Sequence, residues 1–206
     1  FGTGPAHYDV QATALGDTMV FASRRDDKRP QIYLRAADGS VRKLTSGRDA
    51  AHPRLTPDGG SVVFDSAEPG GPGGKKQRDL WLVRTDGTGL TRLTDTPYDE
   101  QGPTVSADGQ RLAYSANPDA AAGAQIYVRP LAGGTATALT GTLGGKATEP
   151  VFNPVNDDAH KNLLAYTYTV DSNTGPRLRE LGRPDGDQPL IAGTAAQGAT
   201  HGAAWM

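Results

Sequence analysis

The sequence predicts an all-β protein, a β-propeller made of four-stranded antiparallel blades. One observation is an internal repeat: LTPDGGSVVFDS at 55–66 returns as VSADGQRLAYSA at 105–116, with Asp-Gly turns at Asp58 and Asp108. A repeat period of about 50 residues is typical of repeat folds such as propellers. A second observation is the composition, because 27 glycines and 15 prolines suit short strands joined by tight turns.

The first half of each repeat predicts two strands joined by a Pro-Asp-Gly-type turn. Besides the copies at 55–66 and 105–116, weaker copies occur at 10–23 and 152–167. Each copy has a polar or Pro-containing entry strand, a turn, and an exit strand that begins with aliphatic, aromatic and small residues.

The second half of each repeat predicts a hairpin that ends in Leu-Thr. Three copies match almost residue for residue: QIYLRAADGSVRKLTS at 31–46, DLWLVRTDGTGLTRLTD at 79–95 and QIYVRPLAGGTATALTG at 125–141. Asp-Gly fits the hairpin turn because primed turns need positive φ, which Gly adopts freely and Asp tolerates. A fourth copy at 177–193 keeps Asp-Gly but lacks the aromatic residue and the Leu-Thr.

Joining the two halves gives four strands in about 45–50 residues, the size of a propeller blade. We predict that residues 1–206 form a single β-propeller domain or a fragment of one. Four blades and a stub leave exposed sheet edges. We therefore expect further blades on another segment or a partner chain; the alternative is an unusually small closed ring. The blades are expected at about 1–47, 48–96, 97–142 and 143–194, and residues 195–206 begin the next one.

Composition and charge exclude several classes of function. The formal net charge is −2 with acids and bases interspersed, so no surface for nucleic acid or an acidic membrane is predicted. The absence of cysteine excludes disulfides and cysteine-based metal sites. No apolar run approaches the roughly 20 residues of a membrane span. The chain begins with Phe-Gly-Thr-Gly-Pro rather than Met or a signal peptide, so we expect the true N-terminus to lie elsewhere.

The two halves together, IYLxxxDGxxxxLT and PxxxPDGxxxxFxS, resemble the TolB-type propeller repeat. The resemblance covers nearly the whole chain, and three copies carry both halves. It implies a propeller that is six-bladed in TolB and seven- or eight-bladed in relatives, so the chain is expected to be part of a six- to eight-bladed ring. Such repeats serve as periplasmic or secreted interaction scaffolds, as gating propellers of prolyl oligopeptidase and dipeptidyl-peptidase relatives, and as the body of oligogalacturonate lyases. The fold alone does not choose among these functions.

The repeated acidic and aromatic residues are interpreted as structural. An Asp before Gly at a predicted turn is explained by backbone hydrogen bonding. An aromatic residue at the same place in every blade is explained by packing between neighbouring blades rather than by ligand stacking. The residues concerned are Asp38, Asp58, Asp86, Asp108 and Asp185, with Phe21, Tyr33, Phe64, Trp81, Tyr114, Tyr127 and Tyr166.

Polar residues just ahead of each first strand are the candidate site. The first strand of a blade lines the central channel, so these side chains are expected near the channel mouth. Three imidazoles and a carboxylate are an adequate ligand set for zinc, manganese or iron, and oligogalacturonate lyases are similar in placing a metal among His and Gln side chains. The candidate metal ligands are His7, His52, Glu149 and His201, and the candidate binding face adds Gln101 and Gly102. The alternative is that each polar residue caps a strand entry and bonds a backbone carbonyl or a channel water.

The sequence holds no Gly-x-Ser-x-Gly elbow, His-Glu-x-x-His motif or phosphate-binding loop. We expect a non-catalytic scaffold, periplasmic or secreted in a bacterium. It would bind a protein or peptide, or a chain segment that completes the propeller, through its loops and channel face. The alternative is the propeller portion of an enzyme. This would be either the gating domain of a prolyl-oligopeptidase-like serine peptidase or a metal-dependent oligogalacturonate-lyase-like propeller with zinc or manganese at the channel histidines.

Overall fold

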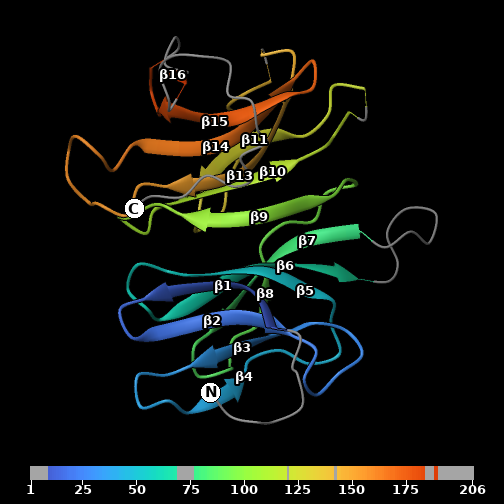
Figure 1. The fold of residues 1–206 in the computed structure, drawn as a ribbon, viewed down its shortest axis with the longest axis vertical. Coiled ribbons are helices and arrows are strands. Elements are labelled where there is room, and N and C mark those ends of the chain that lie inside the picture. The colour runs from blue at the N-terminus through green and yellow to red at the C-terminus, as the bar shows by residue number, and fades with distance from the viewer. Residues whose placement is uncertain (1–8, 69–76, 120, 142, 184–187, 190–206) are drawn as a thin grey trace. The chain divides into compact units, whose positions relative to one another are not determined.

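The structure, a computed structural model, describes residues 9–68, 77–119, 121–141, 143–183 and 188–189. Within these ranges the strands β1 to β16 form four four-stranded antiparallel sheets (Figure 1). The strand order across each sheet follows the chain, which is the meander of a propeller blade. The predicted all-β fold and its four-stranded blades are therefore confirmed. None of the described residues belongs to a helix that could cross a membrane.

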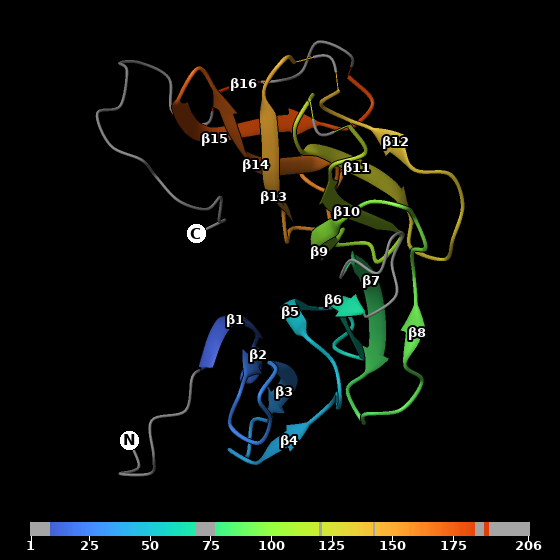
Figure 2. The same cartoon turned by 90° about the vertical axis from the view of Figure 1, so that its right-hand side faces the viewer.

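The chain divides into two compact units, Phe1–Gln101 and Gly102–Met206. The first unit contains two whole sheets, and Figure 2 shows β1 to β4 following one another in chain order. The first sheet consists of β1 (Asp9–Leu15), β2 (Thr18–Ser23), β3 (Gln31–Arg35) and β4 (Val41–Lys43). The second sheet consists of β5 (Ala50–Leu55), β6 (Ser61–Glu68), β7 (Gln77–Arg84) and β8 (Thr91–Arg92).

The other two sheets belong to the second unit, apart from the first two residues of β9. The third sheet consists of β9 (Glu100–Val105), β10 (Arg111–Ala116), β11 (Gln125–Pro130) and β12 (Thr137–Ala138). The fourth sheet consists of β13 (Lys146–Phe152), β14 (Leu163–Val170), β15 (Asn173–Glu180) and β16 (Gln188–Pro189). The division into blade ranges within one domain stays a prediction, and the expected fifth-blade strand at 195–206 lies outside the described residues.

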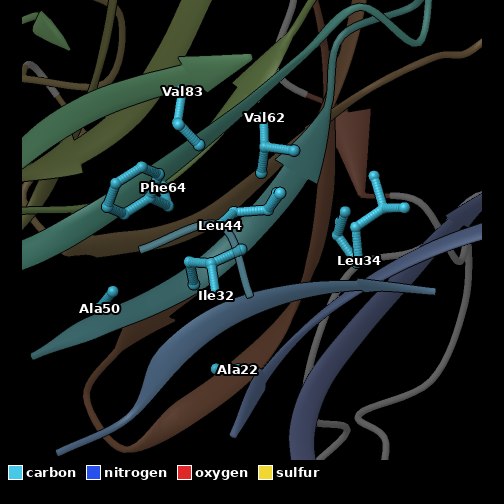
Figure 3. Packing of buried hydrophobic residues seen from close by; sticks show 9 residues of the cluster. Ala22, Ile32, Leu34, Leu44, Ala50, Val62, Phe64 and Val83 are labelled. Carbon is cyan, nitrogen blue, oxygen red and sulfur yellow. The ribbon is translucent and has the colours of Figure 1, made fainter. Parts of the chain in front are cut away.

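The core of the first unit lies between its two sheets. Alternating side chains of β2 and β3 face alternating side chains of β6 and β7, as period-two strands require. Figure 3 shows Val62, Phe64 and Val83 of the second sheet and Ile32 of the first sheet among the side chains of this cluster. Full burial of such side chains stabilises the fold by about 1.5–3 kcal/mol each. The buried members are Val20, Ala22, Ile32, Leu34, Leu44, Ala50, Val62, Phe64 and Val83.

The second unit has a separate core between its own two sheets. Ala113 and Ile126 of the third sheet pack against residues of β13 and β14. Tyr168, in β14, also donates a hydrogen bond to the carbonyl of Leu143 at 2.6 Å. The members from the fourth sheet are Ala147, Phe152, Leu164, Tyr166 and Tyr168.

Aromatic residues of the second and third strands lie opposite one another in three sheets. In the fourth sheet Arg177 stands opposite Tyr166, which matches the missing aromatic residue in that part of the sequence. Phe64 and Trp81 contribute to the core between the first two sheets, and Tyr166 to the core of the second unit. Their interpretation as packing residues is confirmed for these members. The opposed pairs are Phe21–Tyr33, Phe64–Trp81 and Tyr114–Tyr127.

The Leu-Thr signature ends each hairpin with a buried hydrogen bond. The threonine hydroxyl oxygen accepts the backbone N–H of the third strand at 2.9 Å in all three sheets that carry the signature. A threonine at this place therefore satisfies an amide where the short fourth strand has already ended. The acceptor–donor pairs are Thr45–Ile32, Thr94–Leu80 and Thr140–Ile126.

A glutamine extends this hydrogen bonding in the first and third sheets. In the first sheet Thr45 donates to Gln31, whose amide donates to the carbonyl of Arg48 on the way to the next sheet. The second sheet has Asp79 at this position instead, paired with Arg92 at 2.7 Å. Burial raises the pKa of the Asp79 carboxyl. The side chain at this position therefore differs between repeats, whereas the hydrogen bond from the third-strand N–H to the threonine is the same in all three sheets.

The Asp-Gly turns are held by the aspartate side chains. In each turn the carboxylate accepts the backbone N–H of the residue two positions later, at 2.8–3.0 Å. Hydrogen bonds from Ser40, Thr56 and Thr88 hold the pKa of the Asp38, Asp58 and Asp86 carboxyls below their usual value. The structural interpretation is therefore confirmed for Asp38, Asp58, Asp86 and Asp108. Asp185 lies outside the described residues.

Replacing Thr94 by Val should destabilise the protein by about 1–3 kcal/mol, because the N–H of Leu80 loses its buried acceptor while the shape is kept. Urea denaturation followed by circular dichroism measures the change. Thr91→Val on the same hairpin is the matched control, since Thr91 is exposed and should change stability by less than about 0.5 kcal/mol. Equal loss in both variants would contradict the structural role given to the Leu-Thr signature.

Candidate functional site

The first strands carry a repeated irregularity at which one residue adopts a left-handed backbone conformation. The pairing of first and second strands shifts register at this point in β1, β5 and β13, as at a β-bulge. We call the four left-handed positions the bulge residues. They are Gln11 (φ 56°), His52 (φ 49°), Gly102 (φ 61°) and Glu149 (φ 56°).

Three of the bulge residues are not glycine, although their backbone conformation favours glycine. A non-glycine residue held in this region carries strain of about 1–3 kcal/mol, and such strain is concentrated at ligand-binding and active sites. A bulge also re-aims its side chain relative to the pleat of the strand. The bulges are therefore the positions in the repeat at which a side chain departs from the regular β-ladder and becomes available for another contact.

His52 is anchored from behind by a buried carboxylate. Its Nδ1 lies 2.6 Å from Oδ2 of Asp65 on the neighbouring strand β6. The Asp65 side chain has no exposed surface, whereas the His52 side chain is 39% exposed. A carboxylate acceptor fixes the proton on Nδ1, so the lone pair of Nε2 is directed away from Asp65.

Arg78, from β7, supplies the positive charge that compensates Asp65. Its Nη1 lies 2.5 Å from Oδ1 of Asp65, and its Nη2 lies 3.2 Å from Oδ1 of Asp49. Both carboxylate oxygens of Asp65 therefore have partners, one cationic and one imidazole. A buried carboxylate needs such pairing, because an unpaired charge is strongly destabilising.

Gln11 connects the bulge of β1 with the bulge of β5. Its side-chain oxygen accepts the backbone N–H of His52 at 2.9 Å. A second bond between these strands runs from the Thr13 hydroxyl to the carbonyl of Pro53 at 3.0 Å. Two bulge residues, Gln11 and His52, are thus neighbours within the first unit.

The second unit repeats the anchoring with a different pair. The Thr167 hydroxyl donates to Oε2 of Glu149 at 3.0 Å. Thr167 occupies in β14 the place that Asp65 occupies in β6, directly after the second-strand aromatic residue. A side chain on the second strand therefore fixes the bulge side chain in both units.

The structure places some of the predicted site residues at the bulges, some beside them and some outside the described residues. His52 and Glu149 are both bulge residues, and so is Gly102, whereas Gln101 is an exposed neighbour in β9. His52 belongs to the first unit and Glu149 to the second. His7 and His201 lie outside the described residues. The position that matches His52 in the first sheet is Gln11.

A metal site is not assembled by the part of the chain that the structure describes. Within those residues no three His, Asp or Glu side chains gather in a group that could hold an ion. His52 has its Nδ1 bonded to Asp65, and Glu149 accepts from Thr167. The metal set of His7, His52, Glu149 and His201 remains a prediction.

Sequence reasoning missed three members of the site, which are Gln11, Asp65 and Arg78. The signal for two of them was a charged residue that breaks the repeat. Asp65 stands where the other sheets have Ala22, Ser115 and Thr167. Arg78 stands where the first and third sheets have Pro30 and Ala124.

Comparisons by sequence find two curated relatives and no matching family profile. The chain is 38% identical to dipeptidyl-peptidase 5 of Porphyromonas gingivalis over 63 residues, which are 31% of this chain and 9% of the peptidase. It is 28% identical to the uncharacterized protein Atu1656 of Agrobacterium fabrum over 153 residues, which cover 69% of this chain and 50% of that protein. The chain thus spans half or less of each of these relatives.

Comparisons by structure agree on the fold. A protein assigned as TolB from Agrobacterium tumefaciens aligns with a TM-score of 0.71 at 18% identity, over 85% of this chain and 61% of that one. A prolyl endopeptidase aligns with a TM-score of 0.63 at 13% identity, over 92% and 30% of the two chains. An oligogalacturonate lyase in complex with manganese aligns with a TM-score of 0.59 at 14% identity, over 85% and 50%. The chain therefore has a TolB-like β-propeller fold.

Replacing Arg78 by Ala should destabilise the protein by about 3 kcal/mol, because Asp65 stays buried without its cation. The double variant Asp65→Ser, Arg78→Ala should recover at least half of that loss, since the third sheet has Ser115 and Ala124 at these places. Urea denaturation measures both values. A double variant less stable than Arg78→Ala would contradict the charge-compensation argument.

Proposed function

We propose that this chain is a non-catalytic, TolB-like β-propeller segment that binds a protein or peptide partner through its loops and its bulge residues. We further propose an extracytoplasmic location, periplasmic or secreted. The whole protein is expected to contain more blades, on another segment or on a partner chain. Rigid sheets that hold variable positions in fixed places suit recognition without chemistry.

The observation that carries the proposal is the bulge of the first strand. The other repeated features have structural roles, because the aromatic residues pack, the threonines satisfy amides and the aspartates hold turns. The bulge position instead changes its residue from repeat to repeat, as Gln11, His52, Gly102 and Glu149. A binding surface requires such positions, at which the backbone geometry is the same in every repeat and the side chain differs.

The enzyme alternative also has specific support. A short segment is similar to dipeptidyl-peptidase 5, and a prolyl endopeptidase is among the structural neighbours, which fits the gating propeller of a peptidase. The manganese-bound oligogalacturonate lyase fits a metal-dependent propeller. Anchoring of His52 by Asp65 is compatible with a metal ligand, because ligating histidines commonly donate their other N–H to a carboxylate.

Panning a phage library of random dodecapeptides on the immobilised protein tests partner binding. We expect peptides with dissociation constants in the micromolar range, about 8 kcal/mol of binding free energy. Their affinity should fall at least about tenfold, or 1.4 kcal/mol, in His52→Ala or Gln11→Ala. Fluorescence polarisation of the labelled peptides measures both affinities.

The matched controls are His160→Ala and Gln110→Ala, because His160 lies in an exposed loop and Gln110 in an exposed turn. Both controls should bind the selected peptides as the parent does. A failure to enrich any peptide, or peptides that bind the bulge variants unchanged, would contradict the proposal.

Calorimetric titration with Zn²⁺ and with Mn²⁺ separates the scaffold from the metal-dependent alternative. We expect no binding heat that depends on His52, and therefore the same titration for the parent and His52→Ala. His160→Ala is again the control, since it removes an imidazole with a similar exposed fraction. Stoichiometric binding that disappears in His52→Ala alone would favour the lyase-like function.

A further inference from the structure

We infer that Gln11 and His52 form a donor–acceptor pair that binds the main-chain N–H and C=O of one residue in an extended peptide. The inference rests on the proposed function and deepens it, because it names the chemical group that the first unit recognises. Four observations support it: the orientation of the Gln11 amide, the contact of His52 Nδ1 with the Asp65 carboxylate, the adjacency of the two residues, and the exposure of the edge strand β1.

The orientation of the Gln11 amide is fixed by its partner. The backbone N–H of His52 can only donate, so the atom of Gln11 that it meets at 2.9 Å is the carbonyl oxygen. The amide NH₂ of Gln11 is therefore the group that remains for a ligand, and no other partner for it is found within the described part of the chain. Gln11 is exposed, which leaves this donor accessible.

The tautomer of His52 is fixed in the same way. The Asp65 carboxylate is paired with Arg78 and accepts a hydrogen bond from Nδ1–H of His52. With the proton on Nδ1, the lone pair of the imidazole is on Nε2, which is then a hydrogen-bond acceptor. Asp65 and Arg78 act here as positioning residues, because they orient the ring and set which nitrogen carries the proton.

A donor and an acceptor side by side match the N–H and C=O of one residue in an extended chain, because these two groups point to the same side of the chain. The C=O of the ligand would accept from the Gln11 amide, and an N–H would donate to Nε2 of His52. A carboxylate has only acceptors and an ammonium only donors, so neither satisfies both partners. A sugar hydroxyl can do both, and is distinguished from a peptide by the test below.

The strand edge favours the peptide over the sugar. β1 and β5 are each the end strand of their sheet; most of β1 is exposed, whereas β5 is buried or half-buried, with His52 among its half-buried residues. An exposed edge strand can pair with an extended peptide, and hydrogen bonds to the main chain of the peptide then supply the affinity. The register shift at each bulge removes Gln11 and His52 from the regular pairing with the second strand of their sheets.

An ester scan of the strongest display-selected dodecapeptide tests the inference. Each backbone N–H is replaced in turn by an ester oxygen, which removes one donor. We expect one position at which the ester lowers affinity at least fivefold on the parent protein. On His52→Phe, which keeps a ring but removes Nε2, the same ester should cost less than twofold.

Gln11→Glu provides a second measurement that does not depend on the His52 variant. It keeps an oxygen for the N–H of His52 but removes the NH₂ donor, so peptide affinity should fall at least fivefold. Gln110→Glu makes the same charge change at an exposed turn and should leave affinity unchanged.

The outcomes separate this inference from the proposed function. A peptide that binds but gives a flat ester scan, or the same ester penalty on His52→Phe, overturns the inference and leaves partner binding in place. Failure to obtain any peptide overturns both. Binding of trigalacturonate that is lost in His52→Phe, with no peptide bound, overturns both in favour of a sugar ligand.

Discussion

Each sheet must bury apolar side chains against a neighbouring sheet, and this constraint governs most of the chain. In the first unit Ile32 and Phe64 come from different sheets and belong to one core. A change at such a position removes contacts from both sheets at once, with typical losses of about 2–5 kcal/mol for truncation to Ala. Positions free to take new chemistry therefore lie outside these cores, at hairpin tips, connections, the exposed fourth strands and the first-strand bulges.

The charged residues Asp65 and Arg78, next to His52, are an exception to this apolar packing. Asp65 occupies on β6 the place of the buried Ala22 on β2, and its carboxylate would be strongly destabilising without Arg78. Replacing a buried ion pair by well-packed apolar residues is often neutral or stabilising. Folding stability therefore does not explain why Asp65 and Arg78 are present. The orientation of the His52 ring depends on Asp65, which Arg78 pairs with.

Local patterns made the strands, turns and aromatic pairs predictable, because period-two alternation and Asp-Gly encode them within a few residues. His52 and Glu149 could be found as polar residues before a proline in equivalent repeats. Gln11 could not, because Ala12 follows it in place of the proline, and the comparison of repeats fell on His7 instead. Asp65 and Arg78 were missed because the contact of Asp65 with His52 and that of Arg78 with Asp65 each depend on strand pairing across 13 residues.

An anchored imidazole can act as a metal ligand, a general base or a hydrogen-bond acceptor, and each role needs different neighbours. A metal needs two or three further ligands, which the described residues do not gather around His52. A general base needs a nucleophile or bound water within about 3 Å along a substrate path. A hydrogen-bond acceptor needs a donor on the ligand, and the neighbouring Gln11 amide adds a donor for the carbonyl of that ligand. We propose peptide recognition for His52 because the first unit supplies a second polar group for it, the neighbouring Gln11 amide.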